Sequence, residues 1–279
     1  MASYPRSGNT WLRFLLSGYF FGPSDSSIEV SRRIADIHRK PPVNMDRDGT
    51  VMLKTHFQLR PGHPEYERTA AFVFILRNPA DVLLSNFSYL QMVGVLGEMT
   101  LDAFARDFAQ NLGARHWRSS GVGEWVEHAS YWLGARHVPG LLVRYEDLRQ
   151  SPVETLSKIV TFLGENPSSE RLIAAVDAAE ISKLRALEKD EKRAGGPTMF
   201  AGDDNALSQG VRFINTGETR RSLDSIDPAL NDAFDRVFTP RIAELEELAR
   251  GLSGSWQRRF PIVSAIEQEP AFRPSRSTS

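Results

Sequence analysis

Residues Ser3–Leu16 read SYPRSGNTWLRFLL, and this stretch decides the fold that the rest of the chain is expected to adopt. Pro5 ends a short extended segment, Met1–Tyr4, and a helical pattern follows over Asn9–Phe21. The dipeptide Ser7–Gly8 makes a turn small enough for the backbone to approach a ligand. The stretch therefore predicts a strand, a tight turn and a helix whose first N–H groups face the turn.

The start of this helix is suited to an anion, because unpaired N–H groups and the helix dipole both favour negative charge. Asn9 or Ser7 is placed to cap the helix. Arg6 adds a permanent charge with a planar fork of donors, Thr10 adds a hydroxyl and Trp11 adds a flat ring. The stretch predicts a phosphate cradle; an ordinary strand–turn–helix junction with a surface arginine is the alternative.

The cradle differs from the loop of nucleotide triphosphatases. That loop has two glycines separated by four residues and then Lys and Ser or Thr. Here one glycine is present, and the basic residue precedes it.

Short apolar runs alternate with longer helical patterns along the rest of the chain. We expect an α/β fold with a mostly parallel central sheet flanked by helices on both faces. A Gly-, Asp- and Asn-rich region, Lys189–Thr219, is expected to be a long loop. Residues 1–266 are expected to form one domain, and 267–279, rich in Pro, Ser and Arg, a flexible tail. The expected strands are Thr50–Thr55, Ala70–Leu76 and Gly140–Tyr145, and the expected helices are Pro79–Val93, Leu101–Asn111, Val122–Arg136, Val153–Leu163 and Asp227–Leu252.

The composition of the chain limits the classes of partner and the kinds of site that we expect. The 279 residues include 34 Lys and Arg against 35 Asp and Glu, a net charge of −1, so no global positive field would hold a nucleic acid. Cysteine is absent, which excludes disulfides and thiolate metal sites. No apolar run is long enough for a membrane span, and Arg6 and Arg13 interrupt any signal-peptide pattern. We therefore expect a cytoplasmic protein.

A second motif follows the strand that ends at Leu76. Residues Phe72–Phe87 read FVFILRNPADVLLSNF, with Pro79 at the start of a helix. An arginine such as Arg77, at the carboxyl end of a parallel strand, points into the crevice where such sheets bind ligands. Ser85 lies two turns into the helix, on the face of Asp81. The alternative is that Arg77 pairs with Asp81 in a structural salt bridge and that Ser85 only packs.

A catalytic candidate lies in the segment Val51–His56, VMLKTH. Lys54 and His56 are two residues apart at a strand end, so both side chains are expected on one side. A hydroxyl nucleophile needs a base, and the ordinary pKa of His, about 6.5, suits that task at cellular pH. Of the six His, His56 is favoured because Lys and Thr precede it on a strand, whereas His128 is expected in a structural helix.

Taken together, these motifs resemble the sulfotransferases that use 3′-phosphoadenosine 5′-phosphosulfate (PAPS). Residues 4–11, YPRSGNTW, are similar to that family's 5′-phosphosulfate loop, written YPKSGTTW in the animal cytosolic branch. Arg77 and Ser85 match its 3′-phosphate site, and Tyr145 matches a tyrosine that contacts adenine. Lys54 and His56 match its catalytic KTH segment.

The resemblance implies a P-loop NTPase-like fold and in-line transfer of a sulfuryl group from PAPS to a hydroxyl of a small molecule. It implies that His56 is the general base, with Lys54 and Arg6 stabilising charge, and that no metal is needed. Adenosine 3′,5′-bisphosphate (PAP) is the implied product. The implied PAPS-binding residues are Arg6, Ser7, Gly8, Asn9, Thr10, Trp11, Arg77, Ser85, Tyr145, Arg212 and Gly217.

The resemblance weakens toward the C-terminus. The family's RKGxxGDWK segment corresponds here to Arg212–Arg220, where Arg212 and Gly217 are kept but the second basic residue, the first Gly and the Trp are replaced. The family's dimer motif is not recognisable, so the sequence leaves homodimer formation open. The segment Asn86–Trp125 is expected to line the acceptor pocket. Its candidate wall residues, Phe87, Tyr89, Met92 and Trp117, favour an aromatic, lipidic or glycosylated metabolite.

Two other functions remain open from the residues alone. A P-loop kinase or NTPase would use the same cradle for ATP, but it needs a Ser or Thr after a loop Lys and an Asp at a strand end, and neither is evident. A non-catalytic nucleotide-binding module would keep the fold and tolerate the loss of His56.

Overall fold

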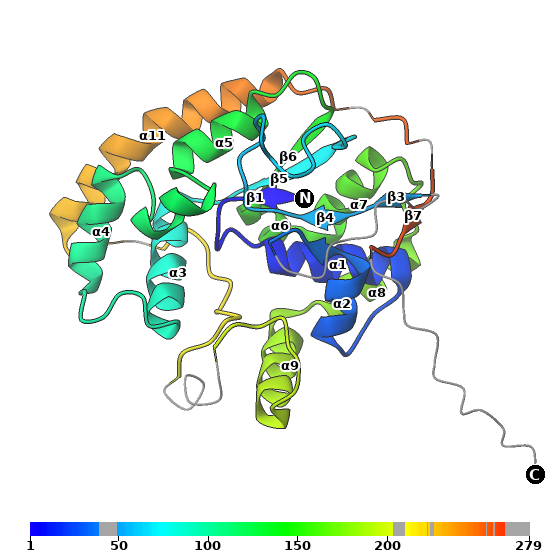
Figure 1. Cartoon of the computed structure of the whole chain (residues 1–279), viewed down its shortest axis with the longest axis horizontal. Coiled ribbons are helices and arrows are strands. Elements are labelled where there is room, and N and C mark those ends of the chain that lie inside the picture. The colour runs from blue at the N-terminus through cyan, green and yellow to red at the C-terminus, as the bar shows by residue number, and fades with distance from the viewer. Residues whose placement is uncertain are drawn as a thin grey trace, which may run out of the picture.

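Three parallel strands lie at the centre of the chain, whose computed structural model describes residues 1–38, 49–202, 210–221, 223, 226–254, 256–258 and 260–265. Strands β1 (Ala2–Ser3), β5 (Phe72–Leu76) and β6 (Gly140–Arg144) pair in the order β1-β5-β6 (Figure 1). A bridge from Ala2 to Thr55 links this sheet to the residue that follows β4. The parallel order places the residues that follow β1, β5 and β6 at one edge of the sheet.

Two shorter parallel pairs complete the described strands. They are β2 (Ala35–Asp36) with β4 (Leu53–Lys54) and β3 (Thr50–Val51) with β7 (Ile262–Val263). The single strand expected over Thr50–Thr55 is therefore two strands, because its two halves pair with different partners. This pairing puts Asp36 directly beside Lys54.

Helices cover both faces of the sheet (Figure 1). Strand β5 divides its side chains between two cores, as a period of two requires: Phe72, Phe74 and Leu76 enter one, and Val73 and Ile75 enter the other. The first core is closed by α3 (Pro79–Met92), α4 (Leu101–Gln110), α5 (Trp125–Leu133) and α11 (Pro228–Arg250). The second is closed by α1 (Asn9–Phe21), α2 (Ser27–Arg33), α6 (Tyr145–Gln150), α7 (Pro152–Phe162), α8 (Ser169–Ala178) and α9 (Ile181–Ala194), while η1 (Arg115–Ser120) is a 3-10 helix. The expected α/β fold with helices on both faces is confirmed.

Local sequence explains where the helices begin. Asn78 caps α3 by accepting hydrogen bonds from the N–H groups of Ala80 and Asp81, and Pro79 occupies the first turn, where its missing N–H costs nothing. Asp227 and Pro228 repeat this arrangement at the start of α11. The start of α3 is therefore fixed directly after Arg77.

The loop expected over Lys189–Thr219 is partly wrong, because α9 continues to Ala194. Its buried positions are Leu184, Glu188 and Lys192, at intervals of four residues. Two of these three are charged, so the helical pattern of apolar residues does not show in the sequence. The predicted tail, 267–279, lies outside the described residues.

We predict that Phe238→Ala lowers the free energy of unfolding by about 3–5 kcal/mol, measured by urea denaturation. The Phe238 ring is 1% exposed, with its centroid 4.3 Å from that of Phe234 and 5.7 Å from that of Trp125. The control is Ile173→Ala, at a 51% exposed position, where we expect a change within about 0.5 kcal/mol. Equal effects of the two substitutions would contradict this packing.

Candidate active site

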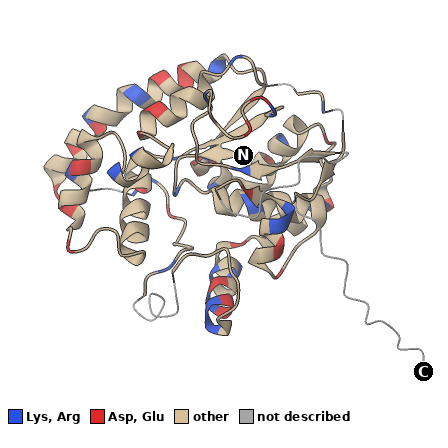
Figure 2. Ribbon diagram, in the orientation of Figure 1, with Lys and Arg blue, Asp and Glu red and all other residues tan. Residues whose placement is uncertain are grey.

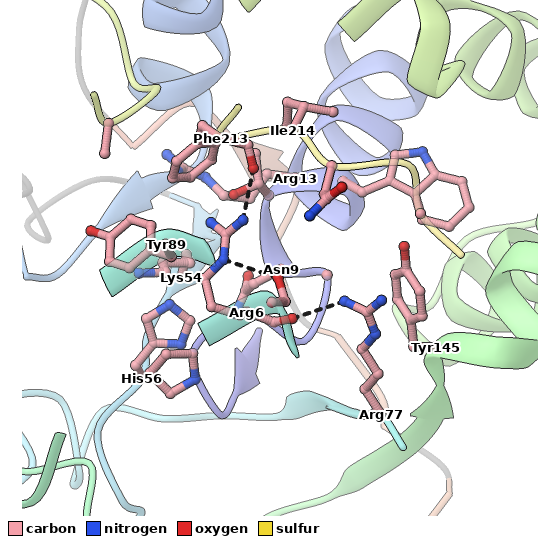
Figure 3. Close-up of a pocket in the computed structure, with 18 of the residues that line it drawn as sticks. Arg6, Asn9, Arg13, Lys54, His56, Arg77, Tyr89, Tyr145, Phe213 and Ile214 are labelled. Carbon is pink, nitrogen blue, oxygen red and sulfur yellow. Dashed lines mark hydrogen bonds between the residues drawn. The ribbon is translucent and has the colours of Figure 1, made fainter. Parts of the chain in front are cut away.

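A cavity of about 380 Å³ lies at the carboxyl ends of the strands (Figure 3). Its wall includes Arg6 from the loop after β1, His56 from the segment after β4, Arg77 from the end of β5 and Tyr145 from the end of β6. Such a crevice is where open parallel sheets bind ligands. The two motifs predicted to hold the two ends of a nucleotide thus share one cavity.

The loop before α1 has an unusual backbone. Arg6 and Gly8 both have positive φ, 71° and 101°, and for arginine this conformation is strained. A Cβ atom added to Gly8 would lie 2.4 Å from the Tyr145 ring, so only glycine fits against that ring. Both residues of this turn, Arg6 and Gly8, lie on the cavity wall.

Unpaired polar groups mark the start of α1. The expected cap by Ser7 or Asn9 is wrong: within the described part of the chain, no side chain caps this helix. The Asn9 amide instead donates to Ser3 Oγ at 3.1 Å and to the Thr55 carbonyl at 3.4 Å. The buried atoms Ser7 Oγ and Asn9 Oδ1 have no hydrogen-bond partner among the described residues. An uncapped helix start beside the unpaired Ser7 hydroxyl, which can donate, fits an anionic group such as a sulfonate or phosphate.

Arg77 reaches the same place from β5. Its Nη1 donates to the Arg6 carbonyl at 3.0 Å, its Nη2 donates to the Glu218 carbonyl at 2.9 Å, and its guanidinium carbon lies 4.2 Å from the centroid of the Tyr145 ring. Its buried Nε has no partner within the described residues. Asp81 pairs with Arg221 at 3.0 Å, so the alternative of a structural Arg77–Asp81 salt bridge is wrong.

Arg6 lies between two aromatic rings (Figure 3). Its guanidinium carbon is 4.9 Å from the Tyr89 centroid and 4.6 Å from the Phe213 centroid, which are cation–π distances. Its Nε donates to Ser85 Oγ at 3.3 Å and its Nη2 to the Phe213 carbonyl at 2.7 Å. Burial lowers the pKa of Arg6 to about 10, so the group remains charged at neutral pH.

His56 is held in one tautomer. Its Nδ1 lies 2.7 Å from the Ser3 carbonyl, which can only accept, so Nδ1 carries the hydrogen and Nε2 has a lone pair. Burial, and next the nearby Lys54 ammonium, lower the pKa of His56 well below its ordinary value. The imidazole is therefore neutral at pH 7 and able to accept a proton at Nε2.

Lys54 has a partner that the sequence analysis missed. Its Nζ lies 3.0 Å from Asp36 Oδ2, and both side chains are about nine-tenths buried. Burial raises the pKa of Asp36, but the Lys54 charge and hydrogen bond, the His38 N–H and the Arg13 charge together hold that pKa below its ordinary value. His38, which accepts a hydrogen bond from the His56 N–H at 2.8 Å, was also missed. Asp36 and His38 stand two residues apart in ADIH, a spacing that indicates one strand face, but that strand is only two residues long.

The other predicted residues divide into two groups. Of the expected acceptor walls, Tyr89 and Trp117 line the cavity, whereas Phe87 and Met92 do not. Ser7 is buried, and neither Ser7 nor Arg212 is on the cavity wall. Phe213 and Ile214, which replace the second basic residue and the first glycine of the family's RKGxxGDWK segment, do line it. The remaining predicted residues on the cavity wall are Gly8, Asn9, Thr10, Trp11, Lys54, Ser85 and Gly217.

Within the described residues, no group of three or more His, Cys, Asp or Glu side chains is arranged to hold a metal ion. Among the helices of the same part of the chain, none combines the length and apolar character needed to cross a membrane.

The chain is similar to known proteins in both its sequence and its fold. The sulfotransferase domain family matches residues 1–250, and the chain belongs to that family. Rat sulfotransferase 1A1 is 24% identical over 264 residues, which cover 88% of this chain and 84% of the rat protein. The flavonol 3-sulfotransferase of Flaveria bidentis is 28% identical over 206 residues, covering 68% of this chain and 63% of the plant protein. The crystal structure of mouse sulfotransferase SULT7A1 complexed with PAP superimposes with a TM-score of 0.60 at 18% identity, covering 89% of this chain and 87% of that chain. The chain is therefore a PAPS-dependent sulfotransferase, as the motifs predicted.

We predict that Gly8→Ala destabilises the protein by about 1–3 kcal/mol in urea denaturation, because the added methyl group overlaps the Tyr145 ring and the positive φ disfavours alanine. Gly196→Ala is the matched control, since an added Cβ there meets no atom within 4 Å. Indistinguishable effects at the two positions would refute the close contact between Gly8 and Tyr145.

Proposed function

We propose that His56 is the general base of sulfuryl transfer from PAPS to a hydroxyl of an aromatic or otherwise apolar small molecule. The observation that carries this proposal is the fixed tautomer of His56, whose Nε2 lone pair belongs to a residue on the wall of the cavity that Arg6 and Arg77 also line. PAPS supplies the activated sulfuryl group, and the residues of this chain orient it and move the proton.

The nucleotide is proposed to lie with its 5′ end at the start of α1 and its 3′-phosphate at Arg77 and Ser85. The unpaired Ser7 hydroxyl and Arg77 Nε support these placements, because each can donate a hydrogen bond to an oxygen of a sulfonate or phosphate. Trp11 and Tyr145, whose ring centroids are 6.0 Å apart in an edge arrangement, are proposed to contact the adenine.

Different residues are proposed to take the proton of the acceptor hydroxyl and to stabilise the negative charge that develops during transfer. As the acceptor oxygen bonds to sulfur, its proton goes to His56 Nε2 and the bond from sulfur to the bisphosphate oxygen breaks. Arg6 and Lys54 are proposed to stabilise the negative charge that develops on the transferring group and on that leaving oxygen. Arg6 is held for this task between two rings, and Lys54 is held by Asp36.

The acceptor class is proposed from the cavity wall. Tyr89, Trp117 and Phe213 give it three aromatic side chains, and Val122 adds an aliphatic one. The Tyr89 ring lies near both others, with centroid distances of 6.1 Å to Trp117 and 6.1 Å to Phe213. Such walls favour a flat apolar body that presents a hydroxyl to His56.

We predict that His56→Ala lowers kcat for transfer of labelled sulfate from PAPS by about 10²–10⁴-fold while PAP binding changes little. Because only the neutral imidazole accepts a proton and its pKa is depressed, the acid limb of kcat/KM in the wild type should fall below pH 6.5. His137→Ala, at an exposed position outside the cavity wall, is the control. Unchanged turnover in the His56 variant would remove His56 as the base.

We predict that Arg77→Lys weakens binding of PAP by at least about ten-fold, since lysine lacks the planar fork of donors. Binding of adenosine 5′-phosphosulfate, which has no 3′-phosphate, should change by less than about three-fold. Both affinities are measured by calorimetry. An equal loss for both ligands would contradict the assignment of Arg77 to the 3′-phosphate, and tight binding of ATP alone, with magnesium, would favour a kinase.

A further inference from the structure

We propose that Glu188, on α9, is a positioning residue that holds Arg6 in its catalytic orientation through the peptide groups of Phe213 and Ile214. The inference rests on the proposed role of Arg6. Glu188 itself is not on the cavity wall, so it acts only through the segment that it holds. We call residues 212–218 the covering segment, because all of them except Arg212 line the cavity.

The Glu188 carboxylate is committed to this segment. Its Oε1 accepts the Phe213 N–H at 2.7 Å and its Oε2 accepts the Ile214 N–H at 2.8 Å. Oε1 also accepts from Lys192 Nζ at 2.7 Å, one turn along α9. The exposed fractions of the Lys192 and Glu188 side chains are 1% and 0%. A charge so deeply buried is retained only when hydrogen bonds satisfy it, and these donors do so.

Phe213 also contacts Arg6, through both its carbonyl group and its ring. The carbonyl of Phe213 accepts from Arg6 Nη2 at 2.7 Å, and its ring covers the Arg6 guanidinium at 4.6 Å (Figure 3). Phe213 therefore receives a hydrogen bond from the arginine through its carbonyl and gives one to the glutamate through its N–H. A shift of this residue would move the carbonyl and the ring away from Arg6 together.

The far end of the covering segment has separate supports. Arg149 Nε donates to the Gly217 carbonyl at 3.0 Å, and Arg77 Nη2 donates to the Glu218 carbonyl at 2.9 Å. Loss of Glu188 should therefore loosen the Phe213 end and leave the Arg77 end in place. In terms of the proposed nucleotide placement, the sulfonate end is affected, and Arg77 stays in place at the 3′-phosphate end.

Helix α9 offers a matched control. It carries charges of both signs along its length (Figure 2), and Glu191 lies three residues after Glu188. The Glu191 carboxylate accepts from the Ser27 N–H at 2.7 Å and from Thr198 Oγ1 at 2.7 Å, so it holds the start of α2 rather than the covering segment. Glu191→Gln thus changes the same helix and the same chemical group without touching Phe213.

The experiment compares Glu188→Gln with Glu191→Gln and with the double variant Glu188→Gln/Lys192→Met, which leaves no unpaired buried charge. Hydrogen exchange of the Phe213 and Ile214 amides and of Arg6 Nε–H is followed by NMR in the protein without nucleotide. We expect exchange at least about ten-fold faster in both Glu188 variants and unchanged in Glu191→Gln. The double variant keeps the test valid if the single variant folds poorly.

Kinetics then separate positioning from general damage. With PAPS and an acceptor, kcat should fall about ten-fold or more in both Glu188 variants, while the Kd for PAP changes by less than about three-fold. Unchanged exchange, or a loss of PAP affinity as large as the loss of kcat, would overturn the proposal. If the wild type shows no transfer from PAPS, the proposed function fails, and the exchange rates at Phe213 and Arg6 still decide whether Glu188 holds them.

Discussion

Two buried guanidinium groups lie beside an uncapped helix start, and the structure around them depends on their need for partners. Arg77 donates a hydrogen bond to the Arg6 carbonyl, and burial lowers the pKa of both guanidinium groups. Concentrated positive charge away from water must be compensated by oxygen atoms or aromatic faces. The chain supplies both, through Ser85, Phe213, Glu218 and the rings around the cavity.

This requirement explains why the covering segment lies where it does. Its carbonyl groups accept from the arginines, while its N–H groups donate to carboxylates: Glu188 accepts from Phe213 and Ile214, and Asp81 accepts from Arg220 just beyond. The segment has little regular structure, so charged side chains replace the backbone partners that a sheet or helix would give it. Arg6 and Arg77, on the cavity wall, thus also hold the segment that covers the cavity.

Much of the fold could be predicted because its signals are local. The buried run ending at Leu76 and the cap and proline at Asn78–Pro79 identify β5 and α3 without any tertiary information. The motifs around Arg6 and around Arg77 could also be predicted to share a site, since both follow strands whose carboxyl ends meet at one edge of the sheet. The predictions of Ser7 and Asn9 as caps are wrong because Gly8, which has no side chain, occupies the N-cap position, and the Asn9 amide bonds to Ser3 Oγ and the Thr55 carbonyl.

The sequence analysis missed Asp36 and Glu188 for the same reason. Asp36 is paired to Lys54 by a two-residue strand, and Glu188 reaches Phe213 across 25 residues that include no pattern linking them. A charged residue on the buried face of a helix looks like a solvent-exposed one in a sequence, so the sequence did not predict α9 and its last residues were expected in a loop. Only the folded chain shows that these carboxylates are partners of the basic groups and of the covering segment.

The central claim is that one nucleotide spans the cavity from the start of α1 to Arg77 and Ser85. A crystal structure of the protein with adenosine 3′,5′-bisphosphate tests it most directly. The account predicts the 5′-phosphate against the N–H groups of residues 8–10, the 3′-phosphate within hydrogen-bond distance of Arg77 and Ser85, and the adenine beside Trp11 and Tyr145. Density for the nucleotide elsewhere, or with its 3′-phosphate turned away from Arg77, would contradict it.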